Sequence, residues 1–154
     1  MRLRNIPGAD DVLKNSTYVI QEPQRLKGIF SEQFRNKNPI HIEIGMGKGR
    51  FITEMAKAHP EINYVGIEMY SSVLLRAVQK MNQLEQENNA PQNLKFICAD
   101  ARTLGDIFAP DEIDRIYLNF SDPWPKDRHA KRRLPSKEFL SVYLDLRFDE
   151  CFFR

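Results

Sequence analysis

A carboxylate and three glycines lie close together in the first third of the chain. Glu43 precedes a run in which alternate residues are glycine: Gly45, Gly47 and Gly49. Glycines let a backbone turn sharply and approach a ligand closely. The dinucleotide-binding fingerprint needs its third glycine three residues after the second, so the alternate spacing weakens an NAD interpretation. A nearby carboxylate disfavours a pyrophosphate and favours a cationic amino group, which S-adenosylmethionine carries.

A second carboxylate, Glu68, lies 19 residues after Gly49 and ends an apolar segment, residues 64–67. A carboxylate at the end of that predicted strand can bind both hydroxyls of a ribose. The glycine loop with Glu43 and Glu68 therefore predicts a site for S-adenosylmethionine. A packing turn flanked by two solvated acids is the alternative interpretation.

The elements that hold these residues alternate between strands and helices. β-branched runs predict strands, and apolar residues at helical spacing predict the helices between them. The predicted strands are residues 40–44, 64–67, 94–98 and 113–120, and the predicted helices start after residues 49, 70 and 135. Such an order indicates an α/β fold with parallel strands, right-handed crossovers and ligands at the carboxyl ends of the strands. The acids at those ends are Glu43, Glu68, Asp100 and Asp122.

Asp100 follows the third predicted strand, and two roles are open for it. Its carboxylate can accept a hydrogen bond from an exocyclic amine such as adenine N6, or it can cap the turn that follows. Cys98, at the end of the same strand, is predicted to be a buried strand residue and no nucleophile.

The segment after the fourth predicted strand combines a carboxylate, an aromatic ring and two prolines. Pro123 and Pro125 restrict the backbone around Asp122 and Trp124, so the segment is predicted to be stiff. A fixed aromatic face beside a carboxylate suits a flat purine. The basic residues that follow are Lys126, Arg128, Lys131, Arg132 and Arg133. This density of cations predicts binding to nucleic-acid phosphates, although a solvated surface would have the same composition.

The composition fits one globular domain. The chain has 154 residues, with 42% apolar and 29% charged side chains. No apolar run approaches the ~20 residues that span a bilayer, so we expect a cytoplasmic protein without a membrane partner. Two distant cysteines and three scattered histidines predict neither a disulfide nor a metal site.

Residues 1–39 are expected to form an N-terminal arm that is extended or partly helical. A short helix is predicted around residues 24–34, ahead of a turn cluster that precedes the first strand. Packing is the main expectation for this arm. Its cations could add a secondary RNA contact, and they are Arg2, Arg4, Arg25 and Lys27.

The motifs resemble those of the bacterial tRNA (guanine-N7)-methyltransferases over almost the whole chain. The matching segments are residues 1–5, 43–52, 63–68 and 120–134. The resemblance implies a Rossmann-like class I methyltransferase sheet with S-adenosylmethionine as cofactor. It also implies methyl transfer to N7 of a guanine in the variable loop of tRNA.

The resemblance also implies roles for individual residues. Cofactor contacts are implied for Glu43, Gly45, Gly47, Gly49, Glu68, Asp100 and Asp122, and Asp122 is also the implied catalytic residue. Substrate or RNA contacts are implied for Lys126, Arg128, His129, Lys131, Arg132 and Arg133. The implied partner is tRNA, without a metal or a membrane, and a monomer or homodimer is expected.

The end of the chain departs from the family. The family's sheet has seven strands, whereas residues 146–154 match none of its motifs. We therefore expect an incomplete α/β domain at residues 40–145, with its fourth strand as an open edge, followed by an atypical tail.

Two other functions stay open. One is an RNA- or cofactor-binding fragment with impaired catalysis. The other is an amino-group nucleic-acid methyltransferase, which would place its aromatic residue after both prolines. In this chain the order is Asp122, Pro123, Trp124 and Pro125, with the aromatic residue before the second proline.

Overall fold

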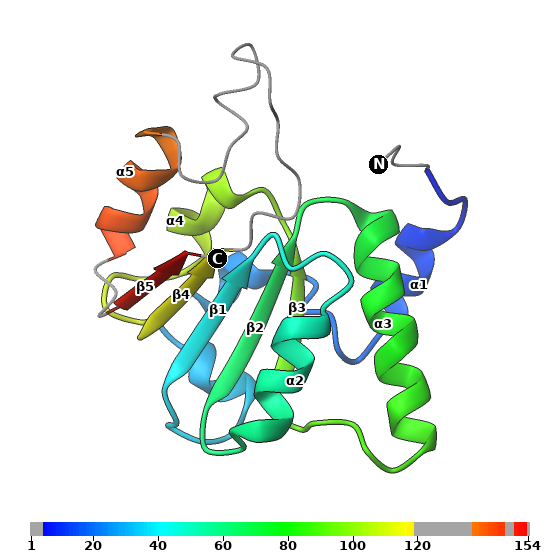
Figure 1. Cartoon of the computed structure of the whole chain (residues 1–154). Helices are drawn as coiled ribbons and strands as arrows, with labels where there is room; N and C mark the ends of the chain where they lie inside the picture. Colours follow the sequence, from blue (N-terminus) through cyan, green and yellow to red (C-terminus); the bar gives the residue numbers. More distant parts are fainter. Residues whose placement is uncertain (1–4, 119–136, 147–149, 154) are drawn as a thin grey trace.

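The computed structural model of the chain describes residues 5–118, 137–146 and 150–153. These residues form a parallel sheet with helices on both faces (Figure 1). The strands are β1 Ile40–Ile44, β2 Asn63–Glu68, β3 Leu94–Cys98, β4 Arg115–Leu118 and β5 Glu150–Phe153. Their order across the sheet is β3-β2-β1-β4-β5, and each neighbouring pair is parallel. The predicted α/β fold with parallel strands is confirmed.

The helices form a layer on each face of this sheet. They are α1 Ala9–Asn15, α2 Arg50–Ala58, α3 Ser71–Gln86, α4 Leu104–Ile107 and α5 Lys137–Leu146, with short 3-10 turns η1 Pro23–Leu26, η2 Phe30–Gln33 and η3 Ala101–Thr103. Residues of α1, α2 and α3 share one apolar core, and residues of α4 and α5 share the other. The sheet therefore separates two cores.

Alternation along β1 explains the two cores. Ile40, Ile42 and Ile44 pack in the core of α4 and α5. His41 points to the opposite face, where its ring centroid lies 5.6 Å from that of Tyr64. All residues of β1 are buried, as expected for a central strand that is covered on both sides.

The edge of the sheet beside β4 differs from the expectation. The fourth strand was expected to be open, but β5 pairs with it in parallel, with Arg115 opposite Glu150 and Leu118 opposite Phe153. The open-edge prediction is wrong. An edge strand presents N–H and C=O groups that another segment can pair with, and the tail carries residues of high strand propensity, Cys151 to Phe153.

The N-terminal arm packs on both the helices and the sheet. Helix α1 lies against α3, with Leu13 buried between them. Farther along, Ile20 N–H donates to Phe96 C=O at 2.9 Å, so the arm runs beside β3. The predicted helix around residues 24–34 is wrong, because two 3-10 turns form there on either side of Gly28, whose φ is +84°.

Glu112 ties this arm to the segment between α4 and β4. Its carboxylate accepts backbone N–H groups of Gly28 at 2.9 Å, Phe30 at 2.8 Å and Ala109 at 2.8 Å. Glu112→Gln would place an amide donor against these donors, and we expect the free energy of unfolding to fall by about 1–3 kcal/mol. Urea denaturation measures this, with the exposed Glu32→Gln as the matched control. If the two variants are equally stable, the hydrogen bonds of Glu112 do not stabilise the fold.

Candidate functional site

The glycine loop joins β1 to α2 at the carboxyl edge of the sheet. Gly45, Gly47 and Gly49 have φ values of +71°, +60° and +77°, a region that other residues rarely adopt. The loop is held against β2, because the N–H groups of Gly45 and Met46 donate to Ile67 C=O at 2.9 and 3.2 Å. The backbone conformation therefore favours glycine at all three positions.

Glu68 closes this loop from the neighbouring strand. Its Oε2 accepts the N–H of Gly47 at 2.9 Å, and its Oε1 accepts the N–H of Tyr70 at 3.2 Å. The residue is 8% exposed. Sequence reasoning placed Glu68 near the loop but did not predict that its carboxylate would bind the loop backbone.

Glu43 is completely buried in β1, with 0% exposure. It is in register with Gly66 of β2 and Tyr117 of β4. The alternative interpretation of two solvated acids is wrong, because neither Glu43 nor Glu68 is exposed. A carboxylate in the central strand is a costly position, and such positions concentrate at functional sites.

Aromatic side chains share the face of the sheet that carries Glu43. His41 lies on this face, and its ring centroid is 6.1 Å from that of Tyr117. The ring of Tyr117 meets the ring of Phe51 from α2 edge to face, at 5.2 Å. Burial raises the pKa of Tyr64 to about 12, so this phenol stays neutral. Glu43 thus shares one face of the sheet with His41, Tyr64 and Tyr117.

Gly66 makes room for the glycine loop on the sheet. A Cβ at Gly66 would overlap the sulfur of Met46, and it would stand 3.1 Å from the ring of Phe96. Met46 is 4% exposed, so its side chain fills the space above this glycine. Sequence reasoning missed the pair, although a glycine inside a strand is a signal of close approach.

Gly66→Ala should therefore disturb the loop. Overpacking of this kind lowers the free energy of unfolding by about 1–3 kcal/mol. The double variant Gly66→Ala/Met46→Ala should recover part of the loss, because the added methyl group then has space. Thermal unfolding of wild type, single and double variants measures both effects. A Gly66→Ala variant as stable as wild type would contradict this packing.

Asp100 follows β3 and caps η3. Its Oδ1 accepts the N–H of Arg102 at 2.9 Å, and the guanidinium of Arg102 approaches Oδ2 at 2.6 Å. Hydrogen bonding from Arg102 lowers the pKa of this carboxyl below its usual value. The cap interpretation of Asp100 is confirmed, whereas its contact with an adenine amine stays a prediction.

Cys98 was predicted to be buried, and that prediction is wrong. Cys98 is exposed, with its sulfur 3.7 Å from Met69 C=O. Strand β2 runs beside β3 as far as Cys98, whereas the described part of the arm pairs with β3 only at Phe96. Partial burial of the sulfur, with Asp10 and Glu68 nearby, raises the thiol pKa.

The remaining predicted site residues lie outside the described residues. They are Asp122, Lys126, Arg128, His129, Lys131, Arg132 and Arg133. Strand β4, which precedes them, ends at Leu118 on the edge where β1 and β2 also end. Within the described ranges, the structure thus brings together Glu43, Glu68 and the three glycines.

The described part of the chain holds neither a metal-binding cluster nor a membrane-spanning helix. No cluster of three or more His, Cys, Asp or Glu side chains there could hold a metal ion. No helix among those residues is both long enough and apolar enough to cross a membrane.

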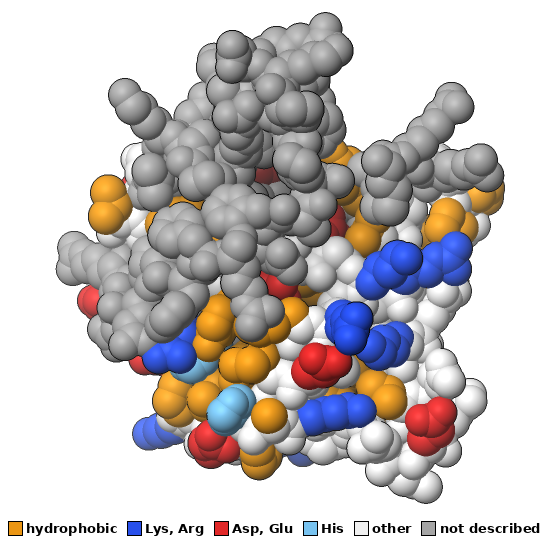
Figure 2. Space-filling view, viewed as in Figure 1, with side chains coloured by type: hydrophobic (Ala, Val, Ile, Leu, Met, Phe, Trp, Pro, Cys, Tyr) orange, Lys and Arg blue, Asp and Glu red, His pale blue; other side chains and the backbone are white. Residues whose placement is uncertain are grey.

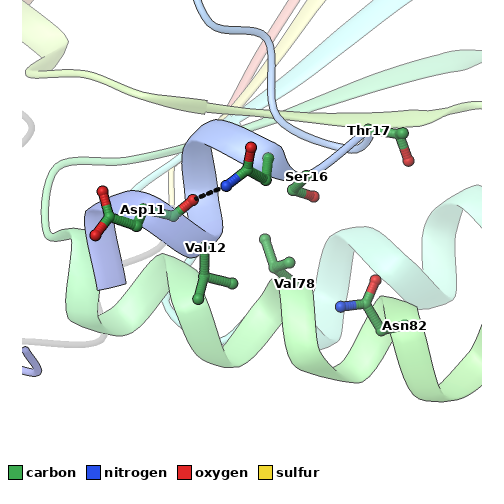
Figure 3. A pocket seen from close by; sticks show the side chains of 7 residues that line it. Asp11, Val12, Ser16, Thr17, Val78 and Asn82 are labelled. Carbon is green, nitrogen blue, oxygen red and sulfur yellow. Dashed lines mark hydrogen bonds between the residues drawn. The ribbon is translucent and has the colours of Figure 1, made fainter. Parts of the chain in front are cut away.

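A hollow of about 430 Å³ lies between α1 and α3 (Figure 3). Its lining residues are Asp11, Val12, Asn15, Ser16, Thr17, Val78 and Asn82. None of them belongs to the glycine loop or to the predicted site. This hollow is therefore distinct from the site at the carboxyl edge.

A family model and individual bacterial proteins both resemble the chain in sequence. A family model described as a putative methyltransferase matches residues 37–146. A protein of Lachnoclostridium phytofermentans named tRNA (guanine-N(7)-)-methyltransferase is 59% identical over 143 residues, which is 93% of this chain and 64% of that protein. A protein of the same name from a Geobacillus species is 54% identical over 151 residues, 97% of this chain and 66% of that protein. The chain thus spans just under two thirds of these relatives.

The fold has relatives among solved structures. One described as an antibiotic related methyltransferase superposes with a TM-score of 0.64 at 23% identity, covering 90% of this chain and 65% of the other. At this identity the likeness establishes the fold, which is that of a Rossmann-like class I methyltransferase sheet.

Proposed function

Because this chain belongs to the tRNA (guanine-N(7)-)-methyltransferase family, we propose that it transfers a methyl group from S-adenosylmethionine to N7 of a guanine in the tRNA variable loop. The observation that carries this proposal is the 59% identity to a relative of that name over 143 residues. The proposed partner is tRNA, and the proposed location is the cytoplasm. A monomer or a homodimer would suffice for this reaction.

The residues at the carboxyl edge fit S-adenosylmethionine. The glycine loop leaves open space, since a Cβ at Gly47 would meet no atom within 4 Å. Glu43 would hold the amino group of the cofactor, because a buried carboxylate is a strong partner for a cation. Each carboxylate oxygen has two lone pairs, so Glu68 can bind Gly47 and Tyr70 and still accept ribose hydroxyls.

Asp100 would bind the amino group of the adenine. Its carboxylate already holds Arg102 at 2.6 Å. One of its remaining lone pairs would accept the adenine N6 hydrogen, so the ion pair with Arg102 can persist. Asp122 is proposed as a further cofactor contact and as the catalytic residue.

The reaction needs no base at the guanine. S-adenosylmethionine, when bound, would supply a methyl group on a sulfonium, whose sulfur would keep the bonding electron pair as the guanine N7 lone pair forms the new bond. N7 carries no proton, so orientation and charge stabilisation are the main requirements. Asp122 would orient the guanine through its N–H groups, and Lys126 would donate to O6 or to a phosphate.

The basic run would hold the tRNA backbone. Its proposed members are Arg128, His129, Lys131, Arg132 and Arg133. Contacts to phosphates position a nucleic acid without reading its sequence. Selection of one guanine would then depend on the shape of the tRNA and on the residues near Asp122.

Transfer of labelled methyl from S-adenosylmethionine to unmodified tRNA tests this function. We expect labelling of tRNA and none of the same tRNA with its variable-loop guanine replaced by adenine. Equal labelling of both RNAs would contradict the proposed target.

A further inference from the structure

A group of exposed cations lies on the outer surface of α2 and α3. Its members, called here the α2–α3 basic face, are Lys48, Arg50, Lys57, Arg76 and Lys80, all exposed. Figure 2 shows lysine and arginine side chains gathered over these two helices. They come from the glycine loop and from both helices, so the grouping is created by the fold and is not visible as a run in the sequence.

The two helices meet where α2 begins. A Cβ at Gly49, the residue that caps α2, would stand 3.2 Å from the Cβ of Ala77 on α3. Arg76 directly precedes Ala77, and Lys80 follows Arg76 by one helical turn. Arg50 and Lys57 are two turns apart on α2, about 10 Å along its axis. The start of α2 therefore lies against α3 beside Arg76.

The acids near this face neutralise little of its charge. Within α2 the acid is Glu54, which lies 3.6 Å from Arg50 in a pair that is mostly exposed. Within α3 the acid is Glu85, and its Oε2 accepts the hydroxyl of Tyr18 at 2.8 Å. Like charges one turn apart, such as Arg76 and Lys80, destabilise a helix. A regularly spaced anionic partner would offset that cost.

The geometry points to an RNA backbone as this partner. Lys48 and Arg50 stand at the glycine loop, and Lys57 ends α2 at the opposite end of the helix. The α2–α3 basic face thus extends from the site edge across the outer surface. We propose that it binds phosphates of the tRNA away from the methylated guanine, an inference that rests on the proposed function.

The double variant Arg76→Gln/Lys80→Gln tests this surface. It leaves the glycine loop unchanged, and it removes a like-charge pair, so the helix should be at least as stable. We expect tRNA affinity to fall about tenfold near 100 mM salt, and the slope of log affinity against log salt to become shallower by about two units. The rate at saturating tRNA should not change. Fluorescence anisotropy with labelled unmodified tRNA measures the affinity.

The control variant Arg35→Gln/Lys37→Gln removes the same net charge elsewhere. Arg35 and Lys37 are exposed and lie between η2 and β1, at the end of the sheet where β1 begins. We expect it to keep wild-type affinity within twofold. Equal losses in both variants would show an effect of total charge and would overturn the proposal.

Unchanged tRNA affinity and salt slope in Arg76→Gln/Lys80→Gln would also overturn the proposal. The α2–α3 basic face would then be a solvated surface or a contact for an acidic protein. Binding and transfer are measured separately. If the wild type methylates tRNA and all variants bind tRNA equally well, only the proposed role of the α2–α3 basic face is refuted. Wild type that binds tRNA through this face without transferring methyl would refute the proposed function alone.

Discussion

Asp122→Asn is expected to lower the single-turnover rate of methyl transfer by roughly tenfold to a thousandfold. As the methyl group moves to N7, positive charge develops on the purine. A carboxylate beside the purine stabilises that charge more in the transition state than in the ground state. Asparagine keeps the size of the side chain but loses its charge, so cofactor affinity should change only modestly.

The rate is measured with enzyme in excess over tRNA and labelled S-adenosylmethionine, while calorimetry reports cofactor affinity. Asp106→Asn is the matched control, because Asp106 is an exposed carboxylate on α4. We expect this control to react at the wild-type rate. A near wild-type rate in Asp122→Asn would contradict the proposal that the Asp122 carboxylate stabilises the transition state.

Glu68→Gln is expected to weaken S-adenosylmethionine binding by roughly 10-fold to 150-fold, which corresponds to about 1.5–3 kcal/mol. The carboxylate has two functions in this proposal. It accepts the N–H of Gly47 at 2.9 Å, which holds the loop, and it would accept the ribose hydroxyls. An amide retains one accepting oxygen and presents donors in place of the other, so it cannot serve both groups.

A cofactor analogue without the ribose 2′-hydroxyl separates these functions. Wild type should bind the analogue more weakly than the parent compound, and Glu68→Gln should bind the two almost equally. If the variant still discriminates as strongly as wild type, Glu68 serves the loop alone. Calorimetry on the four combinations gives the answer.

The parts of the fold that sequence could predict depend on local signals. The isoleucines at alternate positions of β1 and the three glycines after it mark a strand and a turn without any knowledge of the rest of the chain. Strand β5 could not be found in this way, because residues 150–153 become a strand only when the edge of β4 is available. The exposure of Cys98 likewise depends on where the arm leaves β3.

In the candidate site, too, some features follow from local sequence signals and others depend on the folded structure. The positions of Glu43 and Glu68 at strand ends followed from the order of the elements. The bond from Gly47 to Glu68 depends on the path of the loop, and the fit of Met46 over Gly66 depends on the packing of that loop against β2. Such contacts join residues about 20 positions apart, beyond the reach of periodicity.

Formation of 7-methylguanosine is the most direct test of the proposed activity. The 154-residue chain is incubated with S-adenosylmethionine that carries a deuterated methyl group and with unmodified tRNA, and the RNA is digested to nucleosides for chromatography with mass spectrometry. We predict deuterated 7-methylguanosine, formed only when both cofactor and tRNA are present. Deuterated methyl on an exocyclic amine, or binding of cofactor and tRNA without any labelled nucleoside, would contradict the proposed activity.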